Sequence, residues 1–174
     1  MDFIELVKKR YSCRSFSEKQ VEKEKIDLIL EAGRLAPTAG NFQPQRILVI
    51  TDKEKINELK ECTAFTFDAP IVLAICYDKD VSWKRKYDGK DEGIIDVGIV
   101  ATHMMLQIAE LGLGSTIVGC FEPNKAAKIL NIPSNYELEN LLPFGYPSEE
   151  GSKPSSKHYE RENIEKLVYW NDFK

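Results

Sequence analysis

The sequence predicts an α+β protein in which helices wrap a small mixed β-sheet. The chain has 174 residues, enough for one domain that buries a core of its own. Short runs of β-branched and other apolar residues alternate with segments whose apolar residues recur at helical spacing. No internal repeat and no linker-like stretch divides the chain, so we expect residues 1–174 to form a single domain.

The first two segments are predicted to be helices. Asp2 and Glu5 have the spacing of a capping box ahead of an apolar face, and three cations at residues 8–10 close that helix. Apolar residues then recur at helical spacing over residues 26–33, and Pro37 ends the second helix.

The middle of the chain is predicted to contain two strands and two helices. Residues 46–51 and 70–77 are apolar, β-branched runs, as expected for strands buried on both faces. Residues 53–62 carry one apolar face and predict a surface helix. Residues 92–111 predict a long helix that is buried on all sides. Its apolar stretch is interrupted by polar residues and falls short of the roughly 18 to 20 residues that a membrane span needs.

The last third of the chain contains shorter elements. In chain order, we predict a strand at residues 115–118, a helix at 123–131, a strand at 138–146 and a loop at 149–156. Pro143 is unusual within a strand because it cannot donate a ladder hydrogen bond. Residues 164–170 are apolar enough to require a surface on which to dock.

The composition excludes several classes of function. Charged residues make up 30% of the chain and hydrophobic residues 43%, which are ordinary values for a soluble globular protein. The formal net charge of -4 argues against a nucleic-acid partner, which normally demands a strong basic excess. Acidic residues near the start do not fit a secretory signal peptide, and we expect no membrane partner.

The four cysteines, Cys13, Cys62, Cys76 and Cys120, are widely spaced. They form no C-x-x-C pair and have no histidines at ligand spacing, which indicates neither a zinc site nor a disulfide framework. We therefore expect no metal, and reduced thiols in a cytoplasmic protein.

Two segments carry the candidate chemistry. Arg10, Ser12 and Arg14 place two guanidiniums and a hydroxyl within five residues, a combination suited to phosphate. Residues 36–44 form a turn of small and amide residues that allows close backbone approach and hydrogen bonds to a flat polar edge. Together they indicate a site for a phosphorylated aromatic cofactor. The alternatives are a cationic helix end for the first segment and a simple helix-stop turn for the second.

These segments closely resemble the flavin-binding signatures of the nitroreductase family of FMN-dependent oxidoreductases. Residues 96–98, followed by an apolar helix into residues 110–115, resemble the central helix of that family. Residues 145–147 and 164–170 resemble its C-terminal signature. The resemblance covers nearly the whole chain in the family's order. It implies a nitroreductase-like fold and a homodimer with shared active sites.

The resemblance also implies which residues contact FMN. They are Arg10, Tyr11, Ser12, Arg14, Pro37, Thr38, Ala39, Asn41, Gln43, Ile117, Val118, Gly119, Lys157 and Arg161. Arg10 and Ser12 would hold the phosphate end, and Arg14 would face the pyrimidine side of the ring, where a cation stabilises the reduced flavin. The turn around Asn41 would reach the flavin of the partner subunit. Residues 117–119 would line the other side of the ring.

Several of these assignments have plain alternatives. Lys157 and Arg161 form either a second phosphate clamp or part of a solvated loop. For Ile117 and Val118 the alternative is an ordinary core strand that runs into a turn. His103 is interpreted as a core or interface histidine and His158 as an exposed loop residue.

The implied activity is hydride transfer from NADH or NADPH to FMN and then to a small acceptor, such as a nitroaromatic or a quinone. The flavin carries the chemistry, so no catalytic residue is expected beyond Arg14, which supports the reduced ring. The alternatives are flavin destruction, reductive dehalogenation and non-catalytic flavin binding. Longer family members use an Asn and a Lys before the second buried strand. Residues 62–66 contain neither, which leaves Phe65 to cover the ring.

Overall fold

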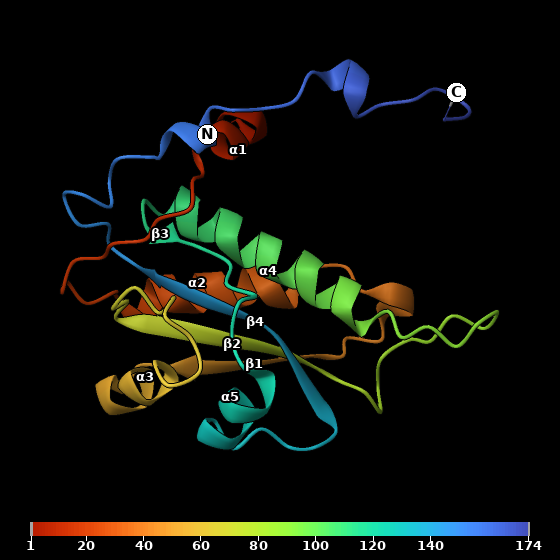
Figure 1. Cartoon of the computed structure of the whole chain (residues 1–174), viewed down its shortest axis with the longest axis horizontal. Helices are drawn as coiled ribbons and strands as arrows, with labels where there is room; N and C mark the ends of the chain where they lie inside the picture. Colours follow the sequence, from red (N-terminus) through yellow and green to blue (C-terminus); the bar gives the residue numbers. More distant parts are fainter. Residues whose placement is uncertain (1, 174) are drawn as a thin grey trace.

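The computed structural model describes residues 2–173 (Figure 1). The helices are α1 (Phe3–Lys9), α2 (Lys23–Arg34), α3 (Lys53–Leu59), α4 (Gly93–Glu110) and α5 (Pro123–Ile129). The strands are β1 (Gln45–Ile50), β2 (Ile71–Asp78), β3 (Gly114–Ser115) and β4 (Tyr136–Gly145). Short 3-10 turns lie at Ala39–Asn41, Ser156–His158 and Ile164–Lys166. The predicted α+β class, with helices around a small sheet, is confirmed.

The sheet has the order β1-β2-β4-β3, and all neighbouring strands are antiparallel. Within residues 2–173 the only parallel pairing is the single bridge between Ser12 and Ser115. The four strands therefore form an antiparallel sheet. The predicted mixture of parallel and antiparallel pairing is present only through that bridge. Apolar runs indicate where strands lie, but they do not encode which strands pair or in which direction.

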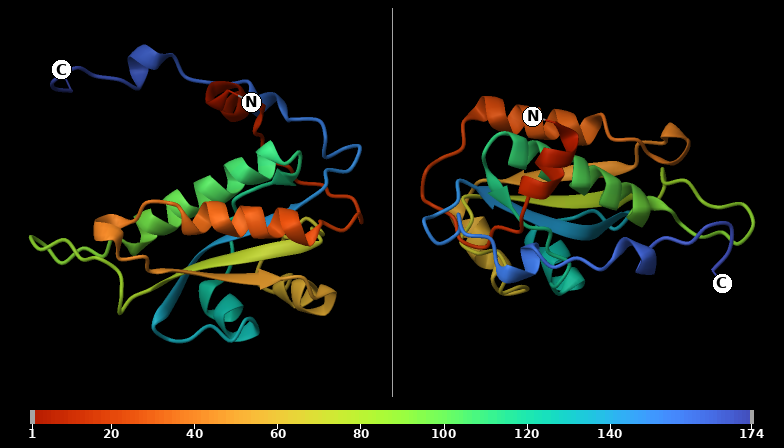
Figure 2. Two further views of the ribbon diagram at one scale, coloured as in Figure 1. Left: turned by 180° about the vertical axis from the view of Figure 1, so that it is seen from behind. Right: turned by 90° about the horizontal axis from the view of Figure 1, so that it is seen from above.

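The sheet is covered on both faces. Helices α2 and α4 pack on one face, and α3 and α5 lie on the other (Figures 1 and 2). Strand β2 is consequently buried at every position, as predicted. Gly33 allows α2 to approach α4 closely, because a Cβ there would lie 2.9 Å from the Met104 side chain.

Three local predictions are wrong. Strand β1 lies at the edge of the sheet and leaves Leu48 42% exposed, so it is not buried on both faces. The third strand is shorter than expected, because only Gly114–Ser115 pairs continuously before Val118 makes an isolated bridge to Leu141. The Asp2 side chain makes no capping hydrogen bond to α1.

Helix α4 is buried on one face only, which contradicts the prediction that it is buried on all sides. Val97, Val100 and Met104 lie in the core, whereas Ile94 and Ile95 are about half exposed. By length and composition α4 is the one described helix that could cross a membrane, but the core helix of a soluble protein passes the same test. Its packing against α2 and the sheet is that of a core helix, with an apolar outer face left uncovered in the single chain.

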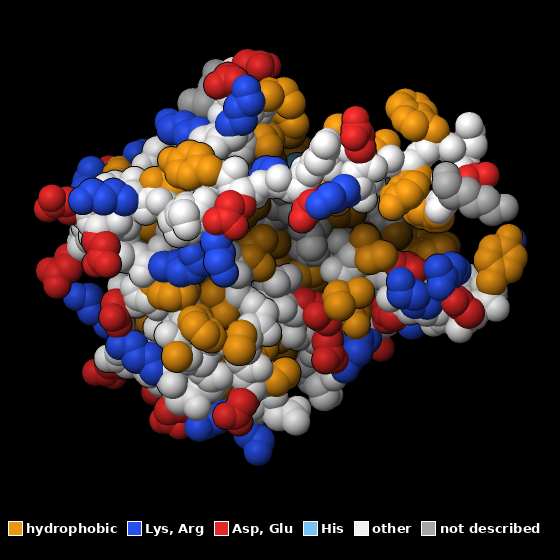
Figure 3. Space-filling model, turned by 45° about the horizontal axis from the view of Figure 1, so that its top comes forward, with side chains coloured by type: hydrophobic (Ala, Val, Ile, Leu, Met, Phe, Trp, Pro, Cys, Tyr) orange, Lys and Arg blue, Asp and Glu red, His pale blue; other side chains and the backbone are white. Residues whose placement is uncertain are grey.

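The last residues form an arm, defined here as residues 160–173, that stretches away from the body of the molecule (Figures 1 and 2). Its apolar side chains are exposed; they are Ile164, Leu167, Val168, Tyr169, Trp170 and Phe173. Figure 3 shows hydrophobic side chains along the arm and on the surface beneath it. The segment predicted to need a docking surface therefore has none within its own chain.

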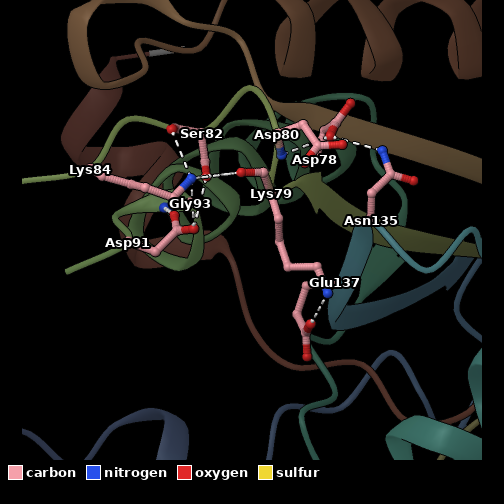
Figure 4. Close-up of polar contacts among 9 residues, drawn as sticks. All are labelled: Asp78, Lys79, Asp80, Ser82, Lys84, Asp91, Gly93, Asn135 and Glu137. Atoms are coloured by element: carbon pink, nitrogen blue, oxygen red, sulfur yellow. Dashed lines mark hydrogen bonds and ion pairs between the residues drawn. The ribbon is translucent and has the colours of Figure 1, made fainter. Parts of the chain in front are cut away.

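Polar contacts fix the loop that leads into α4 (Figure 4). Asp91 accepts from the Gly93 N–H at 2.9 Å and from Ser82 Oγ at 2.9 Å, so it connects the first residue of the helix to the preceding loop. At the neighbouring end of β2, Asp78 accepts from Asn135 Nδ2 at 3.1 Å, and Lys79 lies 3.2 Å from Glu137. The N-terminus of α4 is thereby held in a fixed position relative to β2 and β4.

Candidate functional site

A cleft of about 520 Å³ lies between the segment at the end of α1 and residues 155–161, where the arm begins. Its lining residues are Arg10, Tyr11, Ser12, Arg14, Ser155, Lys157, His158 and Arg161. Six of them were predicted as cofactor contacts, and they come from two regions of the chain separated by about 140 residues. This site is called the cation cleft below.

The cation cleft contains four positive side chains for which the described residues supply no counterion. Within residues 2–173, none of Arg10, Arg14, Lys157 and Arg161 forms an ion pair with a carboxylate. Burial, and then repulsion from Arg161, lowers the pKa of Arg10. Such a cluster has the chemistry of an anion site, because a bound phosphate would neutralise charges that now repel one another.

The wall of the cleft is built by cross-links from distant segments. The Cys13 N–H donates to the Ser115 carbonyl at 2.9 Å, which attaches residues 10–14 to β3. Tyr11 donates its hydroxyl to the Gly151 carbonyl at 2.9 Å. A side chain at position 151 would place its Cβ 1.9 Å from the Ser15 carbonyl oxygen, so only glycine allows this close approach.

Two lining residues, Ser155 and His158, were not predicted. The His158 ring packs edge-on against Tyr11 at 6.3 Å between centroids and against Tyr159 at 4.8 Å. The interpretation of His158 as an exposed loop residue is therefore wrong. Its position one residue after Lys157 and three before Arg161 was the available signal. His103 instead lies on the exposed face of α4, which fits the predicted interface role.

The second predicted segment folds into a tight turn, residues 38–43. Gly40, Asn41 and Gln43 have positive φ angles of 56°, 59° and 51°, a conformation that is uncommon for the two amide residues. Thr38 Oγ1 accepts from the Gln43 N–H at 3.1 Å, and Gln43 donates its side-chain amide to the Asn41 carbonyl at 3.3 Å. Unusual backbone of this kind is typical of functional turns.

The structure does not bring the turn and the cation cleft together within one chain. Ala39 contacts Asp96 near the start of α4, whereas Arg10 and Tyr11 share a small pocket with Ala109 near its end. The intervening 13 residues of helix span about 20 Å. Pro37 and residues 38–43 therefore line no part of the cation cleft in the single chain.

Residues 117–119 leave β3 and cross towards α5. The Val118 N–H donates to the Leu141 carbonyl at 2.8 Å, so the N–H groups of Ile117 and Gly119 point away from β4. Val118 is buried, as the core-strand alternative expected, while Ile117 is 38% exposed. A Cβ at Gly119 would meet nothing within 4 Å.

Phe65 lies close to this segment. Thr63 donates its hydroxyl to the Cys120 carbonyl at 2.7 Å, and its oxygen accepts from the Phe65 N–H at 3.1 Å. Phe65 is partly exposed and packs against Phe67. It is therefore placed next to residues 117–120, consistent with a role over a bound ring. No group of three or more potential metal ligands occurs in the described part of the chain.

The family is decided by comparison with known proteins. The model of the nitroreductase family matches residues 7–64 and 57–146. The chain belongs to the nitroreductase family. The structure of a nitroreductase family protein from Clostridium difficile 630 has 43% sequence identity and a TM-score of 0.93, covering 99% of this chain and 100% of that one. The resemblance noted from the sequence is thus confirmed.

Other members of the family have more specific names. An FMN-dependent nitroreductase from Clostridium difficile R20291 is 31% identical with a TM-score of 0.81, covering 98% of this chain and 100% of that one. A relative from Archaeoglobus fulgidus, provisionally named NADH dehydrogenase/NAD(P)H nitroreductase, is 31% identical over 84% of this chain and 86% of its own length. An iodotyrosine deiodinase from Thermotoga neapolitana is 26% identical over 97% of both proteins.

Proposed function

We propose that the protein is an FMN-dependent oxidoreductase that takes a hydride from NADH or NADPH and passes the electrons to a small acceptor. Membership of the nitroreductase family supports an oxidoreductase with FMN as cofactor and NAD(P)H as reductant. When bound, the flavin accepts the hydride and releases the electrons to the acceptor. The chain itself must bind the cofactor, orient it and stabilise its reduced form.

The cation cleft is the observation that carries this proposal. Arg10, Lys157 and Arg161 form no ion pair within residues 2–173 and fit the phosphate of FMN, to which Ser12 adds a hydroxyl donor. Arg10 and Arg161 are expected to hold the phosphate together, since their mutual repulsion is relieved by an anion between them. We assign Lys157 to the same end of the cofactor.

Arg14 is assigned to the pyrimidine side of the flavin ring. Its guanidinium donates one hydrogen bond to the Ser12 carbonyl at 3.3 Å and is otherwise exposed, so it is available to a ligand. Changing Arg14 to Ala should slow flavin reduction by about tenfold or more, because a charge-assisted contact to the reduced ring is lost. Changing Lys9 to Ala is the matched control, since Lys9 lies outside the cation cleft. Stopped-flow reduction by NAD(P)H measures both, and equal rates would contradict the assignment.

We propose further that the active form is a homodimer whose sites each draw on two chains. The turn at residues 38–43 does not reach the cation cleft of its own chain, and the outer face of α4 and the arm are apolar and uncovered. Symmetric pairing is the commonest way in which such surfaces are buried. Pairing would allow Asn41 and Gln43 to meet the flavin held by the partner.

The acceptor is proposed to be a nitroaromatic or a quinone. Reductive dehalogenation is the second candidate, because the Thermotoga neapolitana deiodinase matches the chain over nearly its whole length. Flavin destruction and non-catalytic flavin binding remain the other outcomes to be separated. We propose that residues 1–174 act as one domain, in the cytoplasm.

The decisive experiment is anaerobic mixing of the purified protein with NADH or NADPH while flavin absorbance is followed. We expect a yellow protein that releases FMN, and not FAD, on denaturation, because the cleft offers one phosphate site and no second one for an adenylate. Bleaching should be reversed by a nitroaromatic or a quinone. Reoxidation by a halophenol with halide release would select dehalogenation, and loss of the flavin itself would select flavin destruction. A protein that binds no FMN, or binds it without reduction by either nucleotide, would contradict the proposal.

A further inference from the structure

Asp96 is a buried carboxylate that no cofactor assignment uses. It lies in the first turns of α4 with only 1% of its surface exposed. One carboxylate oxygen, Oδ1, accepts from the Ala39 N–H at 2.9 Å. The other, Oδ2, is buried and has no hydrogen-bond partner in the described residues. An acidic residue can interact favourably with the helix dipole from the surface, without the cost of burial. The burial of Asp96 therefore needs another explanation.

The backbone group that Asp96 holds belongs to the turn at residues 38–43. Most hydrogen bonds of this turn are internal, such as those of Asn41 N–H to the Thr38 carbonyl and of Phe42 N–H to the Ala39 carbonyl. Arg46 ties the end of the turn to β1 by donating to the Gln43 carbonyl at 3.2 Å. The Asp96 bond is the corresponding tie at the beginning of the turn, and it connects the turn to α4.

We propose that Asp96 is a positioning residue for the flavin, which fixes the turn at residues 38–43 in the shape that contacts the cofactor of the partner subunit. The inference rests on the proposed function, because it assumes that this turn meets a flavin. A turn with two amide residues at positive φ is strained, and strain persists only where surrounding contacts hold it. A carboxylate anchored in a rigid helix is such a contact, and it accepts more strongly than a neutral oxygen would.

The burial of Asp96 has a consequence for stability. Burial raises the pKa of its carboxyl, the Ala39 hydrogen bond opposes that rise, and the charges of Glu92 and Asp91 add to it. Those two carboxylates are in turn paired with cations of the same loop, Glu92 with Lys90 at 3.4 Å and Asp91 with Lys84 at 3.5 Å. Because the folded pKa is raised, this group's contribution to stability is present at low pH and is lost as pH rises through the folded pKa.

Two substitutions test the contact from its two sides. Asp96→Leu removes the acceptor while filling the space, and Ala39→Pro removes the donor. Proline suits position 39, because Thr38 is already extended (φ -131°, ψ 157°) and residue 39 begins a 3-10 turn. Asp96→Asn keeps an oxygen acceptor and is the conservative rescue. Val100→Ala is the matched control, because it removes buried volume from the same helix away from the turn.

The first measurement is hydrogen exchange of the peptide covering residues 36–43 in the protein without cofactor. Exchange should rise about tenfold or more in Asp96→Leu and Ala39→Pro, and the double variant should exchange no faster than either single one. Asp96→Asn and Val100→Ala should leave this peptide near the wild-type rate. Unchanged exchange in both single variants would overturn the proposal, whatever the protein binds. If Asp96→Leu does not fold, Ala39→Pro alone decides the outcome.

The second measurement is FMN affinity by fluorescence titration. It should fall about tenfold in the two disrupting variants and stay within about threefold in Asp96→Asn. Asp96→Asn should also lose the part of the pH dependence of stability that comes from Asp96, a loss of stability as pH rises from below the ordinary carboxyl pKa of 3.8, which thermal unfolding of the variant and the wild type over that range measures. Altered exchange with unchanged FMN affinity would mean that the turn does not serve the flavin and would overturn the positioning role. A wild-type protein that binds no FMN would instead refute the proposed function.

Discussion

Replacing Arg10 and Arg161 together by Gln should lower FMN affinity by about two to four orders of magnitude. Each guanidinium is expected to make a charge-assisted hydrogen bond to the phosphate, and the loss of one such bond costs about 1.5 to 3 kcal/mol. The protein without cofactor should not lose stability, because Arg161 now raises the energy of the charged Arg10 beside it. Lower FMN affinity without lower stability of the cofactor-free protein separates a binding role from a structural one.

Titration of the double variant with FMN at two salt concentrations measures this effect. The affinity of the wild type should fall steeply with salt and that of the variant much less, because fewer cations face the phosphate. Arg34→Gln is the matched control, since Arg34 is exposed, pairs with Glu31 and lies on α2. An affinity within about threefold of the wild type would mean that the cation cleft does not hold the phosphate.

Removal of the residues after Asn163 should weaken dimer formation and FMN binding together. The deleted segment carries six large, exposed apolar side chains. At about 1.5 kcal/mol for each side chain that becomes buried, their docking on a partner is worth on the order of 9 kcal/mol. If the turn at residues 38–43 contacts the flavin of the partner, dimer formation and cofactor binding must each stabilise the other.

Sedimentation equilibrium and FMN titration of the truncated protein test this linkage. The control changes Glu162 and Lys166 to Gln, because this exposed ion pair lies on the same arm and contributes no apolar surface. It should leave both properties unchanged. A truncated chain that sediments as a monomer and still binds FMN with full affinity would refute the shared site.

The sequence predicted the elements of the fold well where local rules decide them. The strand β2, the helix α4 and the proline-led helix α5 lie close to their predicted bounds. Sheet order and strand direction were not predictable, because they depend on contacts between segments far apart in the chain. The burial of α4 was overestimated for a related reason. Apolar residues indicate that a surface must be covered, but not whether the same chain covers it.

The candidate site was predictable in its chemistry and not in its geometry. Arg10 and Arg14 were identified by residue type and spacing and Lys157 and Arg161 by the family resemblance, and the fold gathers all four into one cleft. The amide turn was expected at the same cofactor, yet in one chain it lies near the other end of α4. His158 was missed because a single histidine in a polar loop carries no periodic or compositional signal, and the one signal present was its position between Lys157 and Arg161.

The cation cleft and the turn at residues 38–43 lie near opposite ends of α4, and this separation has a genetic consequence. In the proposed symmetric dimer, each site takes its cation cleft from one chain and its turn from the other. One mutant chain has a defective cleft and a second mutant chain has a defective turn. A mixed dimer of two such defective chains would hold one site with both lesions and one with neither. Two inactive alleles could thus complement each other, with about a quarter of all sites intact when equal amounts pair at random. Two alleles that both damage the cleft would never do so.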